Sequence, residues 1–180
     1  MGGPKALLRD KTGTLFVSRA SGVLRDGGCR RVLVVVGAQA DQVAALLGES
    51  SGADEAVSIV IAHDWNQGMG ASLRAGLSRA IDTDASSVLV SLVDLPDVDA
   101  AVVRRMLHTL GSGRRVLGRA SYDGVAGHPV LIGRDHWLGV IASAHGDSGA
   151  RDYLAQNPPT PVECGDLATG RDVDTPEELG

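Results

Sequence analysis

The sequence holds only two cysteines among its 180 residues, Cys29 and Cys164. They show no CxxC spacing and no zinc-ligand pattern, so no cysteine-based metal or redox motif is present. A disulfide between them stays open, but so few cysteines favour a reduced, cytoplasmic protein. Long apolar runs are missing too, since "VLVVV" at 32–36 is far shorter than the roughly 18 residues of a membrane span. The sequence therefore predicts neither a membrane-spanning helix nor a secretory signal.

Aromatic residues are also scarce, at 3%, and the net charge of the whole chain is −5. Proteins that bind single-stranded nucleic acid stack bases on aromatic side chains, and proteins that bind duplexes present a basic surface. The composition therefore argues against a nucleic-acid partner. Charge is uneven, however, because residues 1–31 hold seven Lys and Arg against two Asp. A basic segment of this kind suits a small polyanion such as a nucleotide.

The chain does contain a regular alternation of strand-like and helix-like segments. Strands are expected at 31–37, 57–62, 87–96 and 160–165, with a strand pair at 114–121 and 127–133. Helices are expected at 39–48, 70–81, 97–110, 134–143 and 146–157, the first ended by Gly48 and the last capped by Asp147 or Ser148. This order predicts a single α/β domain with a mostly parallel sheet covered on both faces. Ligands of such sheets bind beyond the carboxyl ends of the strands.

A glycine-rich turn with a lysine, "GGPK" at 2–5, opens the chain. Glycine allows backbone N–H groups to approach a phosphate closely, and a lysine adds a positive charge. The motif is neither a Walker loop nor GxGxxG. Taken alone, such a motif is more often an ordinary turn than a phosphate loop.

Two carboxylates follow extended segments far apart in the chain. Asp94 in "VSLVDLPDVD" lies at the carboxyl end of a predicted strand, where a carboxylate can bind Mg²⁺ together with substrate phosphates. The alternative is a turn residue or helix N-cap, a role that Asp97 or Asp99 fits better. Asp174 in "DVDTPEEL" is either a second metal ligand or the cap of a final helix.

Two further segments carry candidate binding residues. "WNQGMGASLRAGL" at 65–77 places Gly70 and Ser72 at the start of a helix, where free N–H groups suit a base edge or ribose, although a plain connector is the alternative. His128 in "GHP" lies between a turn and a strand near the presumed cleft. No histidine pair has metal-ligand spacing, and no GxSxG motif supports acyl transfer.

Taken in order, these segments resemble the MobA-like nucleotidyltransferases, and most closely the molybdenum cofactor cytidylyltransferases. "MGGPKALL", "WNQGMGASLRAGL", "VSLVDLPDVD", "GHPVLIG", "GDSGARDYL" and "DVDTPEEL" match the family's segments along nearly the whole chain. The resemblance implies a three-layer α/β/α sandwich with a Rossmann-like sheet. It also implies transfer of CMP from CTP to a phosphate acceptor, molybdopterin, with release of pyrophosphate, and a recipient molybdoenzyme as a possible partner.

The resemblance also implies roles for individual residues. Gly2 and Gly3 would belong to the triphosphate loop, and Lys5 would neutralise charge on the α-phosphate and pyrophosphate. Gly70 and Ser72 would lie near the cytosine and ribose. Asp94 and Asp174 would hold Mg²⁺. Gly127, His128 and Pro129 would face the acceptor.

The sequence departs from the family at its start. The family begins with a strand and a half-loop of the form LAAGxGxR, and neither precedes Met1 here. Because losing a central strand would deprive two neighbouring strands of hydrogen-bond partners, we expect residues upstream of Met1 in the natural protein. If the strand is absent, the phosphate site is half built.

The nucleotide is indicated by one position. Guanylyltransferase relatives usually carry Asp before the loop lysine, whereas this chain has Pro4-Lys5, which favours CTP. A guanylyl- or sugar-phosphate-type transferase is the alternative within the enzyme class. A catalytically weak protein that binds a nucleotide or cofactor and delivers it is the alternative outside that class.

Overall fold

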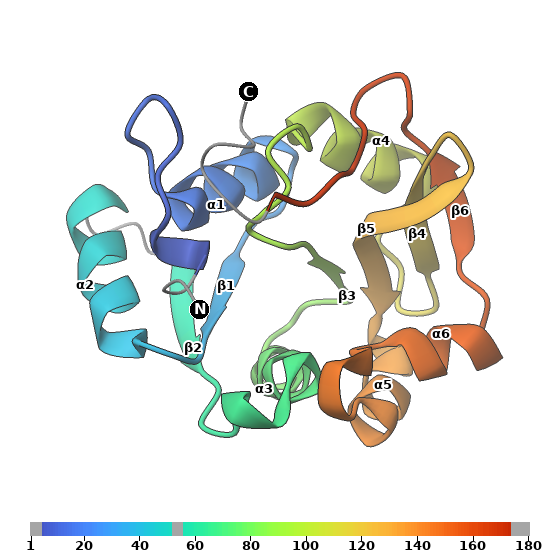
Figure 1. The fold of residues 1–180 in the computed structure, drawn as a ribbon. Helices are drawn as coiled ribbons and strands as arrows, with labels where there is room; N and C mark the ends of the chain where they lie inside the picture. The colour runs from blue at the N-terminus through green and yellow to red at the C-terminus, as the bar shows by residue number, and fades with distance from the viewer. Residues whose placement is uncertain (1–4, 52–55, 174–180) are drawn as a thin grey trace.

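The computed structural model of the chain describes residues 5–51 and 56–173 (Figure 1). Its strands are β1 (Val32–Val36), β2 (Val57–Ile61), β3 (Ser87–Val90), β4 (Leu117–Tyr122), β5 (Val125–Gly133) and β6 (Thr160–Glu163). Its α-helices are α1 (Phe16–Asp26), α2 (Ala40–Ser51), α3 (Met69–Ile81), α4 (Ala100–Leu110), α5 (Trp137–Ser143) and α6 (Arg151–Gln156). Short 3₁₀ helices are η1 (Lys5–Leu7), η2 (Trp65–Gln67), η3 (Arg134–His136) and η4 (Gly146–Ser148). None of the helices in these ranges is long and apolar enough to cross a membrane.

The strands form two sheets. One is the parallel pair β1-β2, and the other has the order β3-β5-β4-β6. Within the second sheet β4 and β6 are parallel, whereas β5 runs antiparallel to both β3 and β4. In the part of the chain that the structure describes, no strand joins β1 to β3. The expectation of a further strand before Met1 stays a prediction.

Helices cover the sheets on two sides and complete three layers (Figure 1). On one side α1 and α2 pack on β1 through Val17, Val43 and Leu47. On the same side α4 packs on β4 and β6 through Val102 and Met106, whose side chains are inaccessible to solvent. A further set of buried residues joins α3, α5 and α6 to β5 on the other side: Leu77, Ala80, Val130, Ile132, Trp137, Val140 and Leu154. The predicted α/β/α architecture is confirmed.

β3 is shorter than the predicted strand 87–96, and the register gives the reason. Val90 is the last residue of β3 and pairs with Val130. The next antiparallel position on β5 would be Pro129, which has no N–H to donate. The chain therefore leaves the sheet after Val90 and carries Asp94 away from it on a turn.

Three other details differ from the sequence analysis. The helix α1 was not predicted, because Leu15 at its N-cap offers no side-chain hydrogen bond and its start carries no recognisable signal. The second helix continues through Gly48 instead of ending there. The last helix has Ala150 at its N-cap, so the predicted caps Asp147 and Ser148 are wrong.

Candidate functional site

Lys5 and Asp94, 89 positions apart in sequence, meet in an ion pair. The Lys5 Nζ donates to Asp94 Oδ2 at 2.7 Å. Asp94 is mostly buried, with 13% of its side chain exposed, and Lys5 is more open at 34%. The glycine-lysine turn and the first predicted metal carboxylate therefore belong to one site. Gly2 and Gly3 lie outside the described residues.

The turn that carries Asp94 is anchored from two other parts of the chain. From α1, Arg19 Nη1 donates to the carbonyl oxygen of Leu95 at 3.4 Å. From the segment after β6, the N–H of Val173 donates to the carbonyl oxygen of Asp94 at 3.0 Å. Asp97 Oδ2 accepts from the Thr169 hydroxyl at 2.6 Å. The turn is thus held by backbone and side-chain contacts that leave the Asp94 carboxylate to Lys5.

The residues at this turn fit a divalent cation. Asp94 Oδ1 is buried and has no hydrogen-bond partner among the described residues. A buried carboxylate oxygen without a partner is costly unless a cation or donor satisfies it. Across the described ranges no three His, Cys, Asp or Glu side chains gather at a metal-binding distance. Mg²⁺ needs only one or two protein carboxylates when substrate phosphates and water complete its coordination shell. The Asp94 carboxylate is therefore enough of a protein ligand for this ion. Asp174, the second predicted ligand, lies outside the described residues.

The start of α3 contacts the segment before α6. The Met69 N–H donates to Asp147 Oδ1 at 3.3 Å, so this helix end already has one acceptor. A Cβ added at Gly70 would lie 3.0 Å from the backbone of Ala144 and His145. Gly70 thus has a packing reason for being glycine. Ser72 lies partly exposed one residue further on, after buried Ala71. The roles of Gly70 and Ser72 toward base and ribose stay predictions.

The "GHP" segment lies on β5 beside the Asp94 turn. Burial and then the positive charge of Arg119 lower the pKa of His128 to about 4, against the opposing charge of Asp94. His128 is therefore neutral at pH 7 and within electrostatic range of Asp94. Pro129 is fully buried, and a Cβ on Gly127 would lie 2.7 Å from the ring of Tyr122.

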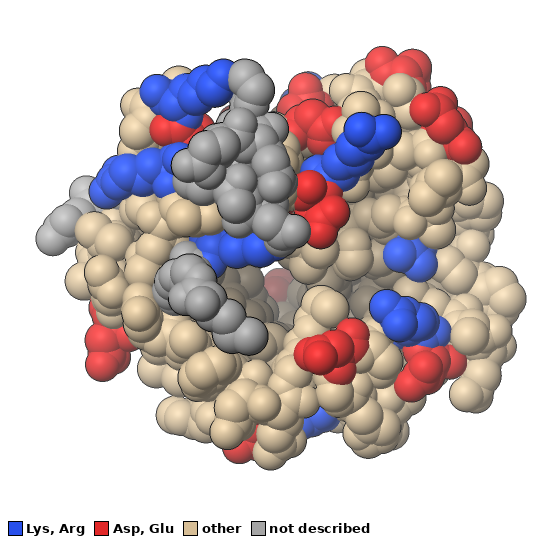
Figure 2. Space-filling model, viewed as in Figure 1, with Lys and Arg blue, Asp and Glu red and all other residues tan. Residues whose placement is uncertain are grey.

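Tyr122 and Arg119, which the sequence analysis did not select, position this segment. The Tyr122 hydroxyl donates to the carbonyl oxygen of His128 at 2.6 Å, and the Arg119 Nε donates to the carbonyl oxygen of Gly127 at 2.8 Å. The signal available in the sequence was a charged residue inside a predicted strand, between Gly118 and Ala120. Viewed from the same side as the fold, the surface is hollowed near its centre, between the β1-β2 part and the β3-β5 part (Figure 2).

Comparison with known proteins places this geometry in context. The sequence model of the MobA-like NTP transferase domain matches residues 1–161. Nicotine blue oxidoreductase of Paenarthrobacter nicotinovorans is 37% identical over 186 residues, which cover 98% of this chain and 86% of that protein.

Solved structures agree with the fold. Rv0371c from Mycobacterium tuberculosis H37Rv superposes with a TM-score of 0.72 at 25% identity, over 99% of this chain and 87% of that chain. A further structure of that protein is a complex with manganese; it has a TM-score of 0.72 at 24% identity and covers 98% and 91% of the two chains. A 4-diphosphocytidyl-2C-methyl-D-erythritol synthase has a TM-score of 0.68 at 16% identity and covers 98% and 90%, which concerns the fold alone.

Proposed function

The chain belongs to the MobA-like NTP transferase family, and on that premise we propose that it transfers CMP from CTP to a phosphate acceptor of the molybdopterin type. The observation that carries the proposal is the Lys5–Asp94 pair, in which the second oxygen of the Asp94 carboxylate has no hydrogen-bond partner among the described residues. A lysine that offsets phosphate charge and a carboxylate that holds a metal are the two groups that this chemistry needs most.

In the proposed reaction a phosphate oxygen of the acceptor attacks the α-phosphorus of CTP. A new P–O bond forms as the bond to the β-phosphate oxygen breaks, and pyrophosphate leaves with that electron pair. Because a phosphate oxygen is already a nucleophile, no side chain has to remove a proton. The protein's task is to hold two polyanions in line and to offset their repulsion.

Individual residues have defined parts in this proposal. Lys5 neutralises charge on the α-phosphate and the leaving pyrophosphate, with Gly2 and Gly3 of the preceding turn. Asp94 would hold Mg²⁺, with Asp174 as a second ligand, and the ion would act as a Lewis acid that offsets the charge of the phosphates. Neutral His128 can donate one ring N–H to the acceptor, and Gly127 and Pro129 shape that side of the site.

CTP is favoured over GTP by Pro4-Lys5, and metal use is supported by the manganese complex of the Rv0371c protein. The product would pass to a molybdoenzyme. The two cysteines are both free, which supports the proposed cytoplasmic location.

The test is a thermal-shift screen of CTP, GTP and UTP with Mg²⁺, followed by pyrophosphate release with CTP and molybdopterin. A ligand at 100 times its dissociation constant adds about 2.7 kcal/mol to the free energy of unfolding. We expect the largest stabilisation with CTP and pyrophosphate release only when both substrates are present. A larger shift with GTP would overturn the choice of base. Binding without pyrophosphate release would favour a delivery protein.

A second candidate is an oxidoreductase, and the 37% identical relative named nicotine blue oxidoreductase favours it. The discriminating assay follows the absorbance of nicotine blue in the presence of the protein and a reductant, against a control without the protein. Turnover in that assay, combined with no pyrophosphate release from any nucleoside triphosphate, would replace the transferase proposal.

A further inference from the structure

A separate cavity of about 380 Å³ opens between β4 and α6, on the side of the sheet away from α4. Two arginines line it, Arg119 from β4 and Arg151 at the start of α6. The rest of the lining is small or apolar and includes Leu154, Ala155, Pro159 and Pro161. A cavity with apolar walls and two guanidinium groups has the composition of a site for an organic anion.

Among the described residues neither arginine makes an ion pair. The Arg119 Nε donates a hydrogen bond to the carbonyl oxygen of Gly127 at 2.8 Å. Burial lowers the pKa of Arg119, and the positive charge of Arg151 lowers it further. Holding two like charges near one another at a partly buried place costs free energy. An anionic ligand would offset that cost.

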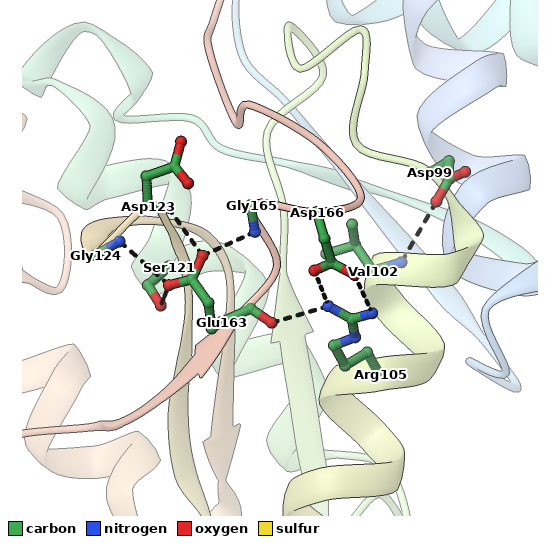
Figure 3. A network of polar contacts seen from close by, with 9 residues as sticks. All are labelled: Asp99, Val102, Arg105, Ser121, Asp123, Gly124, Glu163, Gly165 and Asp166. Carbon is green, nitrogen blue, oxygen red and sulfur yellow. Dashed lines mark hydrogen bonds and ion pairs between the residues drawn. The ribbon is translucent and has the colours of Figure 1, made fainter.

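The acidic side chain closest to this region in the sheet register is Glu163, and it is occupied elsewhere (Figure 3). Its carboxylate accepts from the Ser121 hydroxyl and the Gly165 N–H, both at 2.8 Å. It also accepts from the N–H groups of Asp123 and Gly124 at 2.8 and 3.2 Å. These donors hold the pKa of Glu163 at about 2. Glu163 is therefore ionised and is held at the β4–β5 turn by these donors, and it makes no ion pair with either arginine among the described residues.

The cavity adjoins the candidate site. Arg119 is bonded to the backbone of Gly127 and acts electrostatically on His128, which in turn is within range of Asp94. We infer that Arg119 and Arg151 form an anion subsite for the acceptor, which binds an anionic group remote from the attacking phosphate oxygen. The identity of the ligand rests on the proposed function, whereas the existence of the anion subsite rests on the cavity alone. It predicts an acceptor with at least two anionic groups.

The subsite is tested first with inorganic phosphate alone, by calorimetry and thermal shift in the absence of nucleotide. Replacing one guanidinium by a neutral group should weaken phosphate binding about tenfold. Arg151→Gln is the main variant because Arg151 is exposed, and Arg119→Lys is the second because it keeps the charge but loses the fork. The matched control is Arg115→Gln, at an exposed arginine that lines a different cavity. Unchanged phosphate binding in Arg151→Gln, or an equal loss in Arg115→Gln, would overturn the inference.

A second measurement separates the acceptor from the nucleotide. Calorimetry of CTP with Mg²⁺ on Arg151→Gln should give the wild-type affinity, because the cavity lining includes neither Lys5 nor Asp94. A parallel loss of CTP and phosphate affinity would assign the arginines to the triphosphate and overturn the acceptor assignment. Phosphate binding needs no catalysis. Failure of pyrophosphate release would therefore count against the proposed function and leave the subsite standing.

Discussion

Replacing Asp94 by Asn should greatly reduce turnover and should hardly change the stability of the fold. The change removes the negative charge and keeps the size of the side chain. The ion pair with Lys5 is short, but Lys5 is 34% exposed, so water screens the interaction and its loss costs about 1 kcal/mol at most. The same substitution removes the charge of a buried carboxylate whose Oδ1 has no partner among the described residues, which favours the variant. The two effects oppose each other, and the melting temperature should move by no more than about 4 °C.

The effect on the proposed reaction should be far larger. Without the carboxylate, neither the metal nor Lys5 is held against the phosphates. Loss of one such electrostatic contact typically reduces turnover at least about 100-fold. The assay is pyrophosphate release with CTP, Mg²⁺ and molybdopterin, together with the Mg²⁺-dependent part of the CTP thermal shift. Both signals should collapse in Asp94→Asn.

The matched control is Asp99→Asn, the same chemical change five positions along the chain. Asp99 Oδ1 accepts from the Ala101 N–H at 2.7 Å and caps α4, a role that Asn fills about equally well. Asp99→Asn should keep both activity and stability. The reasoning is refuted if Asp94→Asn retains more than about a tenth of wild-type turnover, or if it unfolds with a loss above about 3 kcal/mol.

Three further predictions concern the residues around the site. The pKa of His128 falls from 6.5 to about 4 on folding, so between these pH values the unfolded chain binds a proton that the folded chain does not. The free energy of unfolding should therefore decrease as the pH falls from 6.5 to 4, by up to about 3 kcal/mol. Denaturant melts of His128→Gln should show a flatter pH profile than the wild type, and identical profiles would contradict the assignment. Tyr122→Phe removes the donor of a buried 2.6 Å hydrogen bond to His128 and should cost about 1–2 kcal/mol in thermal melts, whereas an unchanged melting temperature would mean that the bond contributes nothing. Gly68→Ala places a methyl group 2.6 Å from Asp147 Oδ1 at a φ of +103°, and it should lower the free energy of unfolding by more than about 2 kcal/mol. Gly111→Ala has a φ of +69° and open space around the new methyl group, so it should lower the free energy of unfolding by less. Equal losses in the two variants would show that crowding is unimportant.

The sequence by itself determined the α/β class and the order of most elements. Continuous β-branched runs such as 32–36 and apolar residues at four-residue steps such as those in α3 are local patterns. Local patterns can be recognised in the sequence without knowing which elements pack against them. The motif order also indicated the family. It singled out Lys5 and Asp94 as candidates, because a lysine after glycines and a carboxylate after a strand are recognisable one at a time.

Only the tertiary structure decided that Lys5 and Asp94 meet at 2.7 Å, since nothing in the intervening chain encodes that distance locally. It also decided where β3 ends, because the missing N–H belongs to Pro129 on another strand. Arg119 and Arg151 became a pair in the same way, through the packing of α6 on β4. Charge and hydrogen-bonding partners are properties of three-dimensional neighbours, and the sequence names the groups without saying which of them become neighbours.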